Sequence, residues 1–137
     1  MSSEMTAVSH AALIEEARRA RQRAYAPYSH FMVGAALITA EGRIFHGCNV
    51  ENAAYGSTIC AERSALVSAY SSGFRDIVAL AVVADTKGPV SPCGSCRQVM
   101  YELAGNATII MANMGDALHV TTAKELMPYG LDTSDLP

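Results

Sequence analysis

The sequence predicts an α/β fold, a three-layer α/β/α sandwich around a mixed sheet of about five strands. Two observations support this prediction. Strand-like runs alternate with helix-like segments after an opening hairpin. The chain of 137 residues is 50% hydrophobic and 17% charged, which suits one compact domain with a full core. We therefore expect a single domain over residues 1–137.

The N-terminal part of the chain predicts a helix followed by a hairpin. Residues 6–24 carry alanine and leucine at the 3.6-residue period of an amphipathic helix, which Pro27 ends. Residues 33–40 and 43–49 are strand-like runs on either side of the short turn 41–42, which contains a glycine. This pattern is typical of a β-hairpin.

The middle of the chain predicts two further helices around a buried strand. A helix is expected over residues 60–69, and two serines and a glycine at 71–73 stop it. Residues 77–84 are apolar without polar alternation, as in a strand that helices cover on both faces, so we expect this strand at the sheet centre. The next helix is expected over residues 94–104, with Gly105 at its stop.

The C-terminal part of the chain predicts two strands and a last short helix. Residues 107–111 and 118–121 have the character of strands. Thr122 and Glu125 have the spacing of a capping box, which predicts a short helix that Pro128 terminates.

Composition and charge narrow the class of protein. The chain has 10 Lys and Arg residues against 13 Asp and Glu residues, so its formal net charge of -3 disfavours polynucleotide binding. Residues 1–10 lack the features of a secretory signal, and no run is long enough to cross a bilayer. We therefore expect a cytoplasmic protein that binds neither nucleic acid nor membranes. In that compartment four cysteines indicate a metal site or catalysis rather than disulfides.

Three of the four cysteines have the spacing of a metal site. Cys93 and Cys96 form a C-x-x-C pair at a loop-to-helix junction, where helix amides stabilise thiolates. The pair alone is equally compatible with thioredoxin-like redox chemistry. Cys60, at the start of the preceding helix, favours a metal, because three thiolates can then converge. Three protein ligands leave a tetrahedral zinc one open position, as in catalytic sites, so we expect one Zn2+ per chain.

Cys48 is the alternative fourth ligand. With it the site would be closed, and the chain would be a non-catalytic zinc-stabilised binding module. We favour the open site because Cys48 ends a strand on the same side as Ile44 and His46, and a lone cysteine is more often packed than ligating. His46 is an equally weak candidate.

One acidic and two basic side chains accompany the cysteines. Glu62 lies two residues past Cys60, too close to coordinate comfortably but near enough to act on a water at the metal as general base and then general acid. The alternative is a first-turn glutamate that favours the helix dipole. Arg63 and, as a second candidate, Arg97 are expected to hydrogen-bond thiolate sulfur and offset its charge.

These motifs resemble those of a known family. Cys60-Ala61-Glu62-Arg63 and Pro92-Cys93-Gly94-Ser95-Cys96-Arg97-Gln98 are similar to the two zinc motifs of the cytidine deaminase family, in its small homotetrameric branch. The resemblance covers nearly the whole chain. It implies hydrolytic deamination of cytidine and deoxycytidine to uridine and deoxyuridine with release of ammonia, a role in pyrimidine salvage, and a homotetramer.

A third segment resembles the nucleoside-binding residues of the family. Asn49-Val50-Glu51-Asn52-Ala53-Ala54-Tyr55-Gly56 is similar to the segment that binds the ribose 3'-hydroxyl, which implies substrate contacts for Asn49, Glu51 and Tyr55. In an extended segment Asn49 and Glu51 point to the same side and can converge on one sugar hydroxyl, which favours a nucleoside over a free base. Taken alone, the segment would suit a polar loop with Asx turns equally well.

The resemblance also implies contacts to the pyrimidine base. Phe31 corresponds to the aromatic residue that lines the pyrimidine pocket, although taken alone it would more often be a core residue. The backbone N–H of Ala61 and the carbonyl of Ser91 would hold the polar edge of the base. The C-terminal segment departs from the family, which has Phe at the position of Leu131 and sends that ring into a neighbouring subunit. Leu131 or Tyr129 is then the candidate for this contact.

Two other classes of deaminase would share the chemistry. A deaminase of a modified aminopyrimidine nucleoside, of the blasticidin S type, would have similar zinc motifs, but Glu51 and its neighbours argue against it. A nucleic-acid editing deaminase would need a basic groove, which the net charge of -3 does not favour.

Overall fold

The computed structural model describes residues 3–137. Within these residues the helices are α1 (Ser3–Arg21), α2 (Ala61–Ser71) and α3 (Gly94–Ala104). The strands are β1 (Val33–Thr39), β2 (Ile44–Cys48), β3 (Ile77–Ala84), β4 (Thr108–Asn113) and β5 (Leu118–Thr122), and short 3-10 turns cover Tyr55–Ser57 and Thr133–Asp135. No helix in this range combines the length and the apolar character needed to cross a membrane.

The strands form one mixed five-stranded sheet in the order β2-β1-β3-β4-β5. β1 runs antiparallel to both β2 and β3, β4 runs parallel to β3, and β5 returns antiparallel to β4. The crossover through α3 joins the parallel pair, so the loops that leave β3 and β4 emerge at the same edge of the sheet. The mixed sheet of about five strands predicted from the sequence is confirmed.

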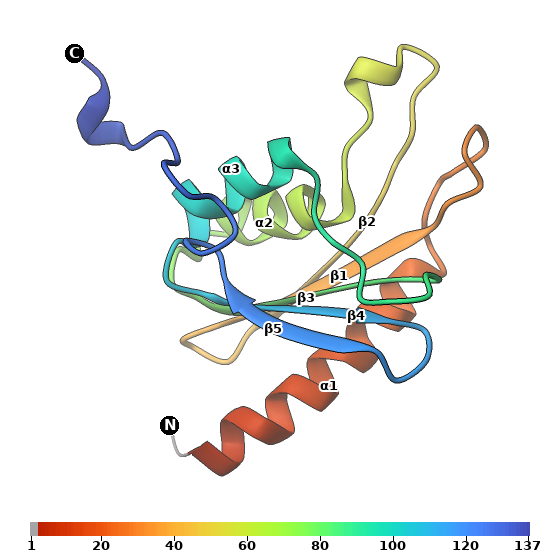
Figure 1. Ribbon diagram of the computed structural model, residues 1–137, viewed down its shortest axis with the longest axis horizontal. Coiled ribbons are helices and arrows are strands. Elements are labelled where there is room, and N and C mark those ends of the chain that lie inside the picture. Colours follow the sequence, from red (N-terminus) through yellow and green to blue (C-terminus); the bar gives the residue numbers. More distant parts are fainter. Residues whose placement is uncertain (1–2) are drawn as a thin grey trace.

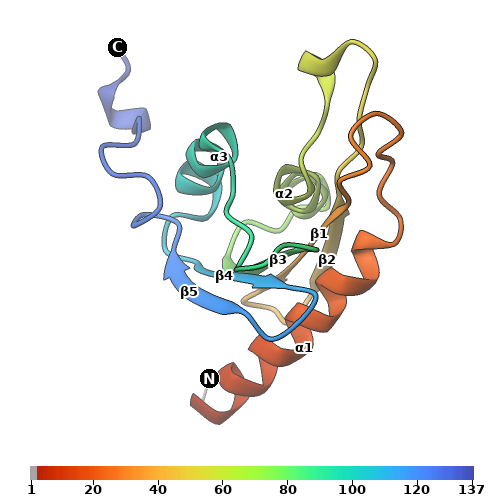
Figure 2. The ribbon, with the colours of Figure 1, turned by 45° about the vertical axis from the view of Figure 1, so that its right-hand side comes forward.

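Helices cover both faces of the sheet, with α1 below it and α2 and α3 above it in Figure 1. Figure 2 looks nearly along α2 and α3 and shows α1 crossing the opposite face. Each face has its own apolar core. Leu80 and Met100 belong to the core under α2 and α3, whereas Leu13 and Ala81 belong to the core against α1. The arrangement confirms the predicted three-layer α/β/α sandwich.

β3 is the central strand and serves both cores. Leu80 packs under α2 and α3, whereas Ala81 and Val83 face α1. Because both faces of this strand are covered, its sequence is an unbroken apolar run rather than an alternating one. The prediction that residues 77–84 form the centre of the sheet is confirmed.

The first helix ends earlier in the chain than predicted. It ends at Arg21 rather than at residue 24. After Arg21 the chain turns, and Tyr25 pairs with Val50 in an isolated bridge whose backbone hydrogen bonds are 2.8 and 2.9 Å long. This pairing removes the last predicted residues from the helix and connects the end of α1 to the segment that follows β2.

The prediction of a short helix after Thr122 is wrong. The Thr122 hydroxyl does contact the N–H and the carboxylate of Glu125, at 3.2 and 3.1 Å, as the capping spacing suggested. The segment nevertheless continues as turns. Pro128 supplies no N–H for a helical bond, and α3 holds the carbonyls of Leu126 and Leu131 by side-chain hydrogen bonds. These tertiary contacts outweigh the local helix signal.

β2 packs closely against the start of α2. A Cβ on Gly47 would lie 2.3 Å from the carbonyl oxygen of Ala61 and 2.5 Å from the backbone nitrogen of Ala65. Only a glycine permits this approach of strand to helix. The contact fixes the first turn of α2, which carries Glu62 and follows Cys60.

Candidate active site

Three thiols meet at two helix starts. Cys60 is the N-cap residue of α2, and Cys93 is the N-cap residue of α3, whose first turn carries Cys96. The three Sγ atoms lie within 4.8 Å of one another, and those of Cys93 and Cys96 are 3.4 Å apart. Helix N-termini favour thiolate through their free N–H groups. The structure thus brings together the three predicted metal ligands.

The thiol of Cys60 is acidic. Its pKa is lowered to about 5, chiefly because the Cys96 thiol donates a hydrogen bond to it, with a further contribution from the Arg63 guanidinium. The same partnership with Cys60, together with burial, raises the pKa of the Cys96 thiol. Arg63 Nη2 donates to Cys60 Sγ at 3.5 Å and to the carbonyl oxygen of Thr58 at 3.3 Å. Arg63 therefore contacts the sulfur of Cys60.

The donor set fits zinc, because three convergent sulfurs are soft ligands that leave a tetrahedral ion one open position. Cys48 lies elsewhere. Phe45 and Gly47 of β2 pack toward α2. Since side chains alternate along a strand, His46 and Cys48 lie on the opposite face, where His46 Nε2 is 2.6 Å from a carboxylate oxygen of Glu16 in α1. Within the described residues Cys48 is therefore not part of the thiol cluster.

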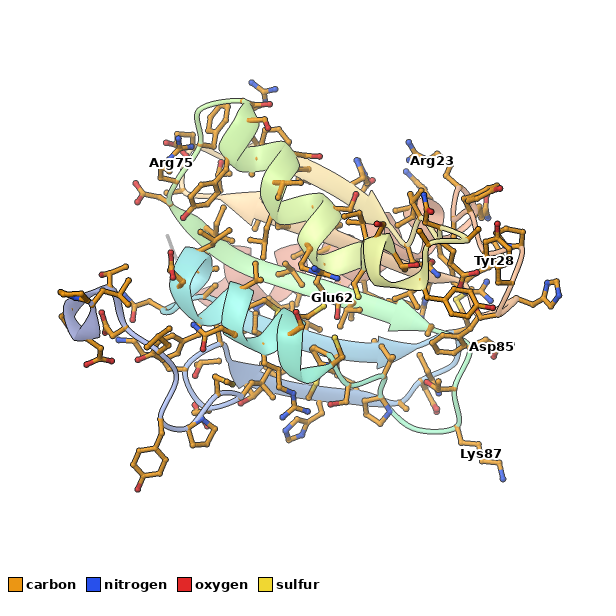
Figure 3. All side chains as sticks on the ribbon, turned by 90° about the horizontal axis from the view of Figure 1, so that it is seen from above. Arg23, Tyr28, Glu62, Arg75, Asp85 and Lys87 are labelled. Carbon is orange, nitrogen blue, oxygen red and sulfur yellow. The ribbon has the colours of Figure 1, made fainter. Side chains whose placement is uncertain are left out.

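Glu62 lies in the first turn of α2 and is 5% exposed. Seen from above the sheet in Figure 3, it lies in the space between α2 and α3. Burial raises its pKa to about 7. A hydrogen bond from its own backbone N–H opposes this rise, and the negative charge of Cys60 adds to it. The carboxyl group is thus held beside the thiols in a poorly hydrated environment, as is typical of a general acid or base.

A cavity of about 210 Å³ opens beside the thiols. Its walls include Glu62, Cys60 and Cys93. Four of the residues predicted to contact substrate also line it, namely Phe31, Asn49, Ala61 and Ser91. Two of the three metal ligands, the buried carboxyl and the three predicted base contacts therefore share one hollow with Asn49.

The other two predicted substrate contacts, Glu51 and Tyr55, line an adjoining cavity of about 410 Å³. Thr58 belongs to the walls of both cavities and marks their junction. Tyr55 is largely exposed, and its ring meets that of Tyr28 edge-on with centroids 5.8 Å apart. The predicted set is thus divided between two hollows that meet at Thr58.

Backbone groups already engage the side chains of Asn49 and Glu51. Asn49 Oδ1 accepts from the N–H of Val33 at 2.9 Å, and its Nδ2 donates to the carbonyl of Phe31 at 2.8 Å. The Glu51 carboxylate accepts from two backbone N–H groups, each at 3.1 Å, and from the hydroxyl of Ser29. These hydrogen bonds lower the pKa of Glu51, and the one from the Ser29 side chain contributes most. A carboxylate has capacity for further donors, such as a sugar hydroxyl.

Arg97 bonds to oxygen rather than to sulfur. Its Nε donates to the carbonyl of Pro92 at 2.8 Å, its Nη2 to the hydroxyl of Ser91 at 2.5 Å, and its Nη1 to the carbonyl of Leu126 at 3.3 Å. In the part of the chain that the structure describes, the bonds to Pro92 and Ser91 fix the loop before Cys93, and the bond to Leu126 connects α3 to the C-terminal segment. The expected contact between Arg97 and a thiolate is therefore replaced by contacts that support the ligand loop.

Three cavity residues are missing from the set predicted from the sequence, namely Val33, Thr58 and Val90. Val33 lies two residues past Phe31, and Thr58 lies two residues before Cys60. In an extended chain, residues two apart face the same side. That spacing is the signal that identifies the first two, whereas Val90 lies three residues before Cys93 and has no such signal.

The fold and the site define a class of protein, a three-layer zinc-binding α/β protein with an open metal position and a buried carboxyl beside it. A family model of the cytidine and deoxycytidylate deaminase zinc-binding region matches residues 7–112. The cytidine deaminase of Sporosarcina psychrophila is 51% identical over 125 residues, which cover 90% of this chain and 92% of that protein.

Solved structures agree with the sequence comparisons. The crystal structure of cytidine deaminase from Burkholderia pseudomallei is 54% identical and has a TM-score of 0.88, covering 89% of this chain and 98% of its own. That of cytidine deaminase from Mycobacterium tuberculosis is 36% identical with a TM-score of 0.76, covering 89% of this chain and 96% of its own. The chain belongs to the cytidine deaminase family.

Proposed function

We propose that the chain catalyses the zinc-dependent hydrolytic deamination of cytidine and deoxycytidine to uridine and deoxyuridine, with release of ammonia. The observation that carries the proposal is the buried carboxyl of Glu62 on the wall of a cavity that also contains Cys60 and Cys93. The cytidine deaminases at 51 and 54% identity support the same chemistry.

Cys60, Cys93 and Cys96 would hold the zinc ion, which when bound supplies Lewis acidity and activates water for attack at C4 of the cytosine ring. Arg63 offsets part of the thiolate charge by donating to Cys60. Glu62 takes one proton from the attacking water and delivers it to ring N3. It then takes the second proton from the same oxygen and passes it to the amine at C4, so that ammonia departs.

Residues of the two adjoining cavities bind the nucleoside in this proposal. Phe31 packs against the base, while the backbone N–H of Ala61 and the carbonyl of Ser91 hold its polar edge. Asn49, Glu51 and Tyr55 bind the sugar. In support, the hollow beside the thiols adjoins the one that contains the Glu51 carboxylate, which suits a base joined to a sugar better than a free base.

The proposal includes a homotetramer, a cytoplasmic location and a role in pyrimidine salvage. In support of assembly, Tyr129 is fully exposed and Leu131 is more than half exposed, so this segment has apolar surface available to a neighbouring subunit. In Figure 1 the C-terminal segment leaves the body of the molecule beyond α3. Sedimentation of the active protein tests the assembly: a tetramer is expected, and a fully active monomer would contradict it.

The function is tested by the ultraviolet absorbance of cytidine after addition of purified protein with measured zinc content. Deoxycytidine, free cytosine and blasticidin S are run in parallel. We expect loss of both nucleosides with about one zinc per chain, and no reaction of free cytosine. Turnover of blasticidin S alone, or bound zinc without turnover of any of the four compounds, would overturn the proposal.

A further inference from the structure

A buried amide at the end of β4 has all of its hydrogen-bonding capacity filled. Asn113 is 7% exposed. Its Nδ2 donates to the carbonyl oxygens of Thr86 at 2.8 Å and Lys87 at 3.1 Å. Its Oδ1 accepts from the N–H groups of Gly115 at 2.9 Å and Ala117 at 3.1 Å. These bonds use both N–H groups and both lone pairs of the amide.

The partners of this amide belong to two different loops. The two acceptors start the loop 85–93, which leaves β3, and the two donors lie in the loop between β4 and β5. β3 and β4 are parallel, and Ala84 pairs with Asn113 at their carboxyl ends, so both loops emerge at one edge. Asp85 and Lys87 mark this edge in Figure 3. In open α/β sheets, ligands bind outside the carboxyl ends of the strands.

The loop 85–93 continues into the wall of the active site. Ser91 and Cys93 both line the cavity beside the thiols. Near its end the loop is held by Arg97, which donates to the Ser91 hydroxyl at 2.5 Å. The loop is thus fixed at its start by Asn113, at Val90 by a backbone hydrogen bond of 3.3 Å to the carbonyl of Ala112, and at its end by Arg97. The site residues lie at the end opposite Asn113.

We propose that Asn113 is a positioning residue for the active site: its amide sets the path of the loop 85–93 and thereby the positions of the Ser91 carbonyl and the Cys93 thiol. The inference rests on the proposed function, in which Ser91 holds the base and Cys93 holds the zinc. Asn113 does not line the cavity and acts through the loop. A residue that only stabilised the end of β4 would support the fold without affecting substrate or zinc affinity.

The variant Asn113→Asp separates the two halves of the contact. A carboxylate keeps both acceptor bonds, but it loses both donors and repels the carbonyl oxygens of Thr86 and Lys87. We expect KM for cytidine to rise about tenfold while kcat changes less than about threefold, because a displaced Ser91 weakens binding in ground and transition state alike. Release of zinc to a chelator should accelerate about tenfold as well.

Ile110→Val in the same strand is the matched control. Ile110 is fully buried in the core against α1, so this variant lowers Tm without touching the loop 85–93. Its KM and zinc release should stay at the wild-type values. Thr86→Val is a second test, since it removes only the hydrogen bond from the Thr86 hydroxyl to the carbonyl of Gly88, which is 2.7 Å long and lies within the loop. We expect it to raise KM by a smaller factor than Asn113→Asp.

The outcomes separate the inference from the function on which it rests. If KM and zinc release in Asn113→Asp and Thr86→Val equal those of Ile110→Val, Asn113 only stabilises the fold and the inference is overturned. If Asn113→Asp does not fold, Asn113→Ser decides by the same two measurements, because it removes the amide that donates to Thr86 and Lys87 without adding a charge. A wild-type protein that binds zinc but leaves cytidine unchanged overturns the proposed function instead, and the chelator measurement still decides the role of Asn113.

Discussion

The guanidinium of Arg63 donates to the Sγ of Cys60 at 3.5 Å, and the same nitrogen donates to the carbonyl oxygen of Thr58 at 3.3 Å. Arg63 therefore joins the first turn of α2 to the extended segment before it. Three thiolates on a divalent cation leave a zinc site with net negative charge, which weakens the Lewis acidity of the metal. A fixed cation on one sulfur opposes that effect.

Arg63→Gln should therefore impair both metal binding and turnover. Glutamine keeps a donor but removes the charge, so we expect kcat/KM for cytidine to fall about 10- to 100-fold and zinc release to accelerate. Arg19→Gln is the control, because the side chain of Arg19 is 70% exposed on α1. Steady-state kinetics and chelator competition measure the two effects. Unchanged values for both would show that Arg63 has no influence on the metal.

Glu62→Gln should abolish turnover while leaving the fold and the zinc content intact. The amide has nearly the same shape but cannot accept a proton, so we expect kcat to fall about 100- to 10,000-fold. Zinc content by atomic absorption and the thermal transition should match the wild type. The matched control is Glu41→Gln, an exposed residue of the turn between β1 and β2. Near-normal kcat in Glu62→Gln would refute its role in proton transfer.

Removal of Cys48 should leave the metal site unchanged, because this residue lies on the α1 side of β2. We expect Cys48→Ala to bind one zinc per chain and its Co2+-substituted form to keep the thiolate charge-transfer absorbance of the wild type. Cys93→Ser should reduce that absorbance by about a third, since it removes one sulfur of the three. An equal reduction in Cys48→Ala would contradict this prediction and would indicate that Cys48 is a fourth ligand in a closed, four-sulfur site.

Much of the fold and of the metal site follows from local sequence signals. The apolar run 77–84 identified the central strand because burial on both faces leaves no position for a polar residue. Cys60, Cys93 and Cys96 were identifiable because few residue types bind zinc and both segments start helices. In each case the chemistry requires a particular type of residue at a particular spacing.

Features that depend on backbone partners left no such signal. Asn113 bonds to Thr86 and Lys87, 27 and 26 residues away, through carbonyl groups that every residue has. The same holds for the segment after Thr122, where local capping favoured a helix. There Gln98 exchanges two hydrogen bonds of 3.0 Å with the backbone of Leu131 and helps to hold the segment as turns along α3. Long-range contacts of this kind outweigh local propensity.

Gly47→Ala should damage the site through packing alone. The added Cβ would lie 2.3 Å from the carbonyl oxygen of Ala61, so β2 and the start of α2 must separate. We expect a loss of about 1–3 kcal/mol in the free energy of unfolding, together with weaker zinc binding, because Cys60 caps the displaced helix. Gly56→Ala is the control, since a Cβ there would have no atom within 4 Å beyond its immediate chain neighbours. Urea unfolding and chelator competition measure both effects; equal values for the two variants would contradict this account.

The contact between Glu16 and His46 should make stability depend on pH. Their side chains are 2.6 Å apart, and the hydrogen bond with His46 is the main cause that lowers the pKa of Glu16. Because the folded-state pKa lies below the unfolded value of about 4.3, the stabilisation is fully present above that value and is lost as the pH falls through the folded-state pKa. The pair is worth at most about 1 kcal/mol, since the Glu16 side chain is 27% exposed and water screens the pair.

Glu16→Gln isolates this effect. Urea unfolding gives the free energy of unfolding of the variant and of the wild type at each pH from about 6 to 3. Effects that both proteins share, such as metal release, cancel in the difference between the two values. We expect the wild type to be more stable at pH 6 and the difference to shrink toward pH 3, whereas Glu41→Gln at the exposed turn between β1 and β2 gives no such trend. A difference that stays constant over this range would mean that protonation of Glu16 is not linked to folding. High salt should shrink the difference at pH 6, because the pair is partly exposed.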